Sequence, residues 1–129
     1  MWILIPTVSF GYFIATFLAR GTGIQQHLGL RPNVPDWRVC ARTVKFGPVT
    51  GYLYWWMNYH IEHHTYAAVP FFNLRKLHQA MAFDTPVPQK GYWRGVARIL
   101  SIQRRQRQDP GYTHMPEFPA TAAPPRLST

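Results

Sequence analysis

The sequence predicts an all-α chain, and three segments carry that prediction. Met1–Ala19 is an uncharged apolar run that would form a helix of ~28 Å, close to the thickness of the hydrocarbon core of a membrane. Asn73–Phe83 repeats leucine and methionine at the spacing of one helix face. Trp93–Arg107 is a basic helix candidate that ends in the sequence RRQR. These segments together indicate a helical chain with an apolar beginning and a basic second half.

We expect residues 1–20 to form a membrane-embedded helix. All 14 Lys and Arg residues lie at Arg20 or beyond, so the positive-inside rule places the rest of the chain in the cytoplasm. A secretory signal peptide does not fit, because no positive charge precedes the apolar stretch. Pro6 and Gly11 interrupt the run, and a buried helix of a soluble domain is the alternative. The predicted localisation is therefore the membrane, with a single-pass or embedded helix and a cytoplasmic C-terminal region.

The composition narrows the classes of partner and of metal site. The 14 Lys and Arg residues exceed the 5 Asp and Glu residues, and the net charge of +9 suits an acidic partner such as anionic lipid, nucleic acid or an acidic protein. Cys40 is the single cysteine, which excludes an internal disulfide and Cys-rich zinc or iron–sulfur sites. A reducing compartment is the simplest interpretation.

Residues 21–112 form the predicted central region, and residues 113–129 a Pro-rich flexible tail. The central region begins as a loop broken by prolines, with a short helix around Asp36–Val44. Residues 46–59 carry no charge and are rich in aromatic rings. We expect Tyr52, Trp55 and Trp56 to line an apolar tunnel or a membrane interface, and ordinary core packing is the alternative.

The sequence HIEHH places three histidines at helical spacing. Offsets of three and four residues bring His63 and His64 to the helix face of His60. Three imidazoles this close would repel one another if protonated, so we expect them to be neutral and to share a cation. Imidazole suits iron, zinc, copper and nickel. Half of the 6 histidines lie within these five positions, which is a poor fit to the alternative of three unrelated side chains. Glu62 points off that face and is expected to be solvated or to support a ligand.

The remaining polar candidates have structural interpretations on position alone. His27 and Asn58 would each be hydrogen-bonding structural side chains, His78 a packed or capping residue, and His114 a solvated residue of the tail. No G-x-S-x-G motif, Gly-rich phosphate loop or dinucleotide fingerprint occurs. No catalytic residue is therefore predicted beyond the metal ligands.

Residues Tyr52–His78 resemble the last histidine box of the membrane fatty acid desaturase superfamily. The box HIEHH is followed by a short apolar turn, a proline and the N-L-x-x-L-H helix typical of that family. The upstream QHLGL, with the later RTV, resembles the E/Q-H-x-G-L segment that precedes this box. The likeness covers about residues 10–112 and is similar to the rhizobitoxine-desaturase subgroup.

The resemblance implies a site, a reaction and partners. His27, His60, His63 and His64 would be iron ligands, and Asn58 would hold a metal-bound water. Complete members use two irons and O2 to introduce a double bond into an acyl chain. The implied substrate is an acyl lipid or acyl thioester, and the implied electron donor is a carrier such as cytochrome b5 or ferredoxin. Membrane lipid is an implied partner, and nucleic acid is not.

The sequence departs from the family in its number of histidines. Members carry two earlier boxes, of the forms H-x(3–4)-H and H-x-x-H-H, and neither occurs here. We therefore expect a C-terminal fragment or truncated copy that is inactive on its own. The alternatives are a non-catalytic basic protein that binds membrane surfaces or nucleic acid, a related hydroxylase or ketolase fragment, and a mononuclear zinc hydrolase.

Overall fold

The computed structural model describes residues 2–127, with the side chains of residues 12–15 and 17–19 left undescribed. Met1, at the start of the predicted membrane-embedded run, and residues 128–129, at the end of the predicted tail, lie outside this range. The chain is mostly helical, as predicted, and adds two very short strands. The elements in order are α1 Leu4–His27, α2 Trp37–Cys40, β1 Val44–Lys45, α3 Pro48–Leu53, α4 His60–Thr65, the 3-10 helix η1 Phe71–Asn73, α5 Leu74–Met81, β2 Gln89–Lys90 and α6 Tyr92–Gln108.

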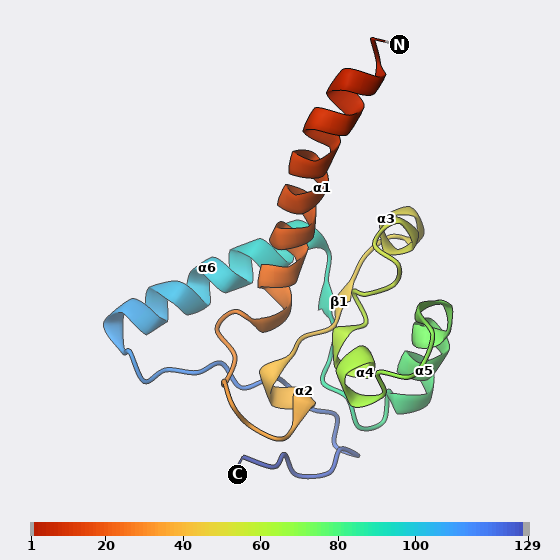
Figure 1. Cartoon of the computed structure of the whole chain (residues 1–129). Helices are drawn as coiled ribbons and strands as arrows, with labels where there is room; N and C mark the ends of the chain where they lie inside the picture. The colour runs from red at the N-terminus through yellow and green to blue at the C-terminus, as the bar shows by residue number, and fades with distance from the viewer. Residues whose placement is uncertain (1, 128–129) are drawn as a thin grey trace.

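Helix α1 is the longest element, and its first half stands clear of the other elements (Figure 1). Ile5 and Val8 in that half are 63% and 73% exposed. Within the described part of the chain, no helix combines the length and the apolar character that crossing a membrane requires. The membrane-embedded helix of residues 1–20 stays a prediction.

The end of α1 is fixed by a glycine. Leu28 leaves the helix with an extended backbone, and Gly29 follows with φ +79°. A Cβ on Gly29 would lie 2.5 Å from Cγ2 of Ile102 on α6. Because only glycine fits both this φ and this close approach, α1 stops at His27 and packs against α6.

A small parallel sheet joins the middle of the chain to its second half. Val44 of β1 pairs with Gln89 of β2, and Lys45 pairs with Lys90. The Val44 amide donates to the Asn58 carbonyl at 3.0 Å, which ties the turn before α4 to the sheet. The buried apolar side chains around it come from several elements: Val39, Val44, Ile61, Leu74, Ile99 and Ile102. This core holds α4 in place.

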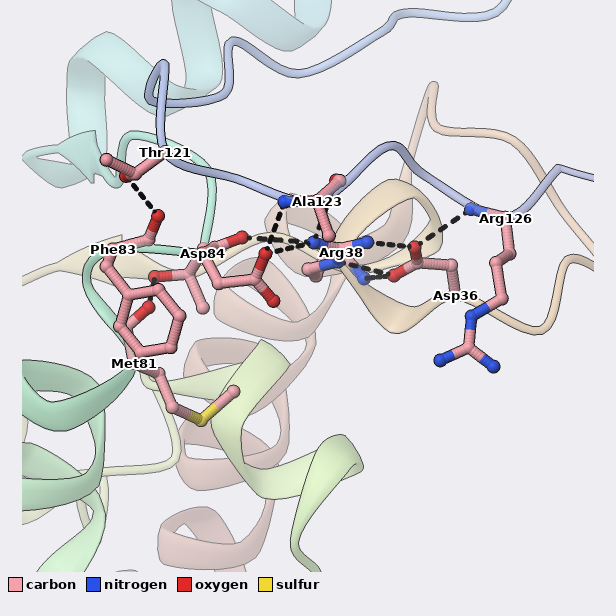
Figure 2. A network of polar contacts seen from close by, with 9 residues as sticks. Asp36, Arg38, Met81, Phe83, Asp84, Thr121, Ala123 and Arg126 are labelled. Atoms are coloured by element: carbon pink, nitrogen blue, oxygen red, sulfur yellow. Dashed lines mark hydrogen bonds and ion pairs between the residues drawn. The ribbon is translucent and has the colours of Figure 1, made fainter.

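The Pro-rich tail predicted over residues 113–129 makes hydrogen bonds to the rest of the chain within its described part, and its flexibility stays a prediction. Arg38 lies between Asp36 and Asp84, with a 2.6 Å ion pair to each, and also donates to the Ala123 carbonyl at 3.2 Å (Figure 2). The Ala123 and Arg126 amides donate to the same two carboxylates, at 2.9 and 3.1 Å. Proline removes amide donors from this segment, yet two of its amides and one carbonyl find partners in the ionic group of Asp36, Arg38 and Asp84.

Candidate metal centre

The ends of two helices bring three histidines together. His27 is the last residue of α1, and His60 is the first residue of α4. His64 follows His60 by four residues, one helix turn later, so both rings lie on the same side of α4. The site therefore depends on where α1 ends and where α4 begins.

The three rings face one another through their Nε2 atoms. Nε2 of His60 lies 2.7 Å from Nε2 of His27 and 3.0 Å from Nε2 of His64. One ring nitrogen from each of the three lies within 4.8 Å of those from the others. Nitrogens that bind one ion at ~2.0–2.1 Å lie ~3 Å apart when their bonds make a right angle. The observed spacing fits the ligand set of a single metal ion.

Neighbouring groups orient two of these rings. Nδ1 of His27 lies 3.0 Å from the Cys40 carbonyl, which can only accept, so Nδ1 carries the proton and Nε2 keeps its lone pair. The Trp37 ring stacks on His64 with centroids 4.4 Å apart and an interplanar angle of 19°. Such outer contacts fix the tautomer and the ring orientation of metal-binding histidines.

Burial and mutual repulsion favour the uncharged form of His60 and His64. Burial lowers the pKa of His60 to about 3, and the nearby His64, His27 and His63 contribute in the same direction. Burial also lowers the pKa of His64, again with help from His27 and His63. Neutral imidazoles are the form that binds metal. The lowered pKa values of His60 and His64 agree with the expectation of neutral histidines, and the shared cation stays a prediction.

His63 lies apart from this group. Its ring nitrogens are not among those that lie within 4.8 Å of one another in the group of His27, His60 and His64. An offset of three residues turns a side chain by about 60° from the first, to the opposite side from an offset of four. The structure thus gathers two of the three box histidines with His27, and leaves His63 beside them.

Glu62 is fully buried, so it is not the solvated carboxylate that was one expectation for it. Its Oε2 accepts from the Thr43 hydroxyl at 2.6 Å, and its Oε1 lies 2.5 Å from Nδ1 of His78. The contact fastens α4 to the segment before β1 and to α5. The sequence did not predict these two contacts of Glu62, because neither Thr43 nor His78 shares a local pattern with the histidine box.

The structure gives the remaining candidates, Asn58 and three aromatic residues, other surroundings. Asn58 is buried and donates to the Val44 carbonyl at 2.8 Å. Tyr52 and Trp55 are 69% and 61% exposed, and Trp56 packs against Gly51. A cavity of about 310 Å³ adjoins the cluster instead, with His27 and Trp37 in its wall. The tunnel and water-binding roles stay predictions.

The described part of this mostly helical chain thus gathers three imidazoles, from two helices, in an arrangement that could hold a metal ion. The chain belongs to the fatty acid desaturase family, whose model, described as Fatty acid desaturase, matches residues 1–112. The resemblance drawn from the histidine box is therefore confirmed at the level of the superfamily, and the subgroup stays a prediction. No curated protein and no solved structure matches the chain. The family consists of membrane-associated oxidoreductases of lipid metabolism that typically use iron.

Proposed function

We propose that this chain contributes part of the iron centre of an O2-dependent fatty acid desaturase. The observation that carries the proposal is the convergence of His27, His60 and His64 within 4.8 Å in a chain that belongs to this family. Bound iron would supply the activation of O2 for removal of two hydrogens from adjacent carbons of an acyl chain.

The protein's own part is to hold one ring nitrogen from each of three histidines toward one point. The Cys40 carbonyl holds the proton of His27 on the far nitrogen, and Trp37 limits rotation of the His64 ring. Glu62 anchors the helix that carries His60 and His64. His63 and Asn58 are proposed as contributors to a second ion and to a bound water.

Four histidines are roughly half of what a two-iron centre of this type requires. We therefore expect the 129-residue chain to bind metal without desaturating a substrate by itself. We propose desaturation as the outcome, and a related hydroxylase or ketolase fragment is the alternative.

The proposed surroundings are a membrane and an apolar substrate. The exposed apolar face of α1 would lie in the membrane, and the cavity beside His27 would admit an acyl lipid or acyl thioester. A net charge of +9 suits a small acidic electron carrier such as cytochrome b5 or ferredoxin.

The test is iron retention by the full chain. Purified wild type is loaded with ferrous iron without oxygen, desalted, and its iron measured by mass spectrometry. We expect the wild type to retain iron and His27→Ala, His60→Ala and His64→Ala to lose it. His114→Ala is the matched control, since it removes a histidine outside the cluster and should retain iron. Equal retention in all variants, or none in the wild type, would refute the proposal.

A further inference from the structure

A second cavity, of about 230 Å³, lies between the segment that follows α2, strand β2 and helix α6. None of the four candidate iron ligands is in its described wall. The wall instead carries basic side chains with a single acidic one: Arg42, Lys90, Arg94, Arg98, His114 and the acidic Glu117. This wall has a strong excess of positive charge.

Arg42 is the most deeply placed of these cations. Its Nη1 donates to the Gln25 carbonyl at 2.7 Å, whereas its Nη2 is buried without a hydrogen-bond partner among the described residues. Burial, with a smaller contribution from Arg98, lowers the pKa of Arg42 to about 10. The group is still charged at neutral pH, and a buried charge without a counter-ion is costly.

The side chains that face Arg42 do little to neutralise its charge. Arg98 donates to Oε1 of Gln89 at 3.2 Å, and its Nη2 lies 3.8 Å from Oε1 of Glu117. Glu117 is 80% exposed, and a pair of this length and exposure contributes little. Burial lowers the pKa of His114, and the neighbouring Arg98 and Arg42 add to that effect. Positive charges therefore meet across the cavity.

From this arrangement we infer that the cavity binds a phosphate group, with the Arg42 and Arg98 guanidinium groups as its principal donors. A guanidinium offers two parallel donors to phosphate oxygens, and several cations around one cavity suit a dianion better than a single carboxylate. A soluble phosphate monoester and the head group of a lipid present the same oxygens to this site, and the second arm of the test separates them. The site is separate from the histidine cluster and does not depend on the proposed iron chemistry.

The first arm of the test uses inorganic phosphate and the metal-free full chain. Calorimetric titration is run at neutral pH, with chloride added to hold the ionic strength constant. We expect Arg98→Gln and Arg42→Lys to weaken binding by at least ~10-fold, because each loses charge-assisted hydrogen bonds. Arg104→Gln is the matched control: it removes the same charge from an exposed position of the same helix and should bind as wild type.

Circular dichroism confirms that each variant is folded. Arg94→Gln, at an exposed position of the same wall, replaces Arg42→Lys if that variant does not fold.

The second arm distinguishes the two sources of phosphate. Vesicles that contain phosphatidic acid are compared with vesicles that contain phosphatidylserine at equal charge density. Preference for phosphatidic acid that Arg98→Gln abolishes and Arg104→Gln keeps assigns the cavity to a lipid head group. Phosphate binding without that preference assigns it to a soluble monoester. No phosphate binding beyond the chloride control, or equal loss in Arg98→Gln and Arg104→Gln, would overturn the inference.

Discussion

His60 is the residue on which the candidate centre depends, because its Nε2 lies within 3.0 Å of both other ligand atoms. His64 belongs to the same set, and His63 does not. A sequence pattern cannot separate the two, since both have an offset typical of one helix face.

We predict that His64→Ala weakens metal binding far more than His63→Ala. Loss of an outer contact to a ligand already costs ~10–100-fold in affinity, so loss of the ligand itself should cost at least that. His63→Ala should change the affinity for a first ion by only a few-fold. Competition with a chromophoric chelator measures the metal affinity of both variants. Equal losses would place His63 in the same ligand set.

A second prediction concerns acid stability of the metal-free chain. The pKa of His60 is about 3 in the folded state, against an ordinary value of 6.5, so the unfolded chain binds more protons between these values. The lowered pKa of His60 therefore leaves the free energy of unfolding at its highest above about pH 6.5, and lowers it as the pH drops toward 3. Urea unfolding across this range should show a shallower loss in His60→Gln than in the wild type. The same slope in both proteins would contradict the assignment.

At the scale of elements, α4 is held by a buried carboxylate rather than by its own length. It has only 6 residues, and isolated helices that short are unstable. Glu62→Ala would leave the Thr43 hydroxyl and the His78 ring without their partner.

We predict that Glu62→Ala costs about 3 kcal/mol of unfolding free energy and weakens metal binding with it. Urea denaturation gives the first quantity and chelator competition the second. Glu117→Ala is the control, because that side chain is 80% exposed and should change stability by less than ~0.5 kcal/mol. Comparable stability of the two variants would show that Glu62 does not anchor the helix.

Elements with a visible period were predictable, and the others were not. The segments 73–83 and 93–107 correspond closely to α5 and α6, because a helix of two or more turns repeats its apolar face. Strands of two residues have no period, so β1 and β2 gave no signal. The helix expected over 36–44 ends at Cys40. Beyond it, the Thr43 hydroxyl donates to Glu62 and the Val44 amide donates to the Asn58 carbonyl.

Helix α1 carries a prediction of its own. Its exposed apolar face should hold the chain at a membrane, with a gain of ~25 cal/mol per Å2 of apolar surface buried. Ile5→Asp combined with Val8→Asp should release the chain into the supernatant after an alkaline carbonate wash, while wild type and Arg104→Gln pellet. A double variant that stays in the pellet would assign attachment to another surface.

At the scale of the whole molecule, residues far apart in sequence come together to form both the histidine cluster and the basic cavity. His27 and His60 are 33 residues apart, and Arg42 and Arg98, which line one cavity, are further apart in sequence. His27 was identified through the family resemblance, because position alone favoured a structural role. The basic cavity gave no sequence signal beyond net charge, since its cations come from separate segments. The ionic group around Arg38 likewise connects residues 36, 84 and 126.

The most direct test of the metal centre is iron X-ray absorption spectroscopy on the ferrous-loaded full chain. The structure predicts three imidazole ligands to the first ion in the wild type, two in His27→Ala, and an unchanged count in His114→Ala. An imidazole count that does not fall when His27 is replaced, or a wild-type spectrum without imidazole scattering, would contradict the assignment of His27, His60 and His64 as one metal site.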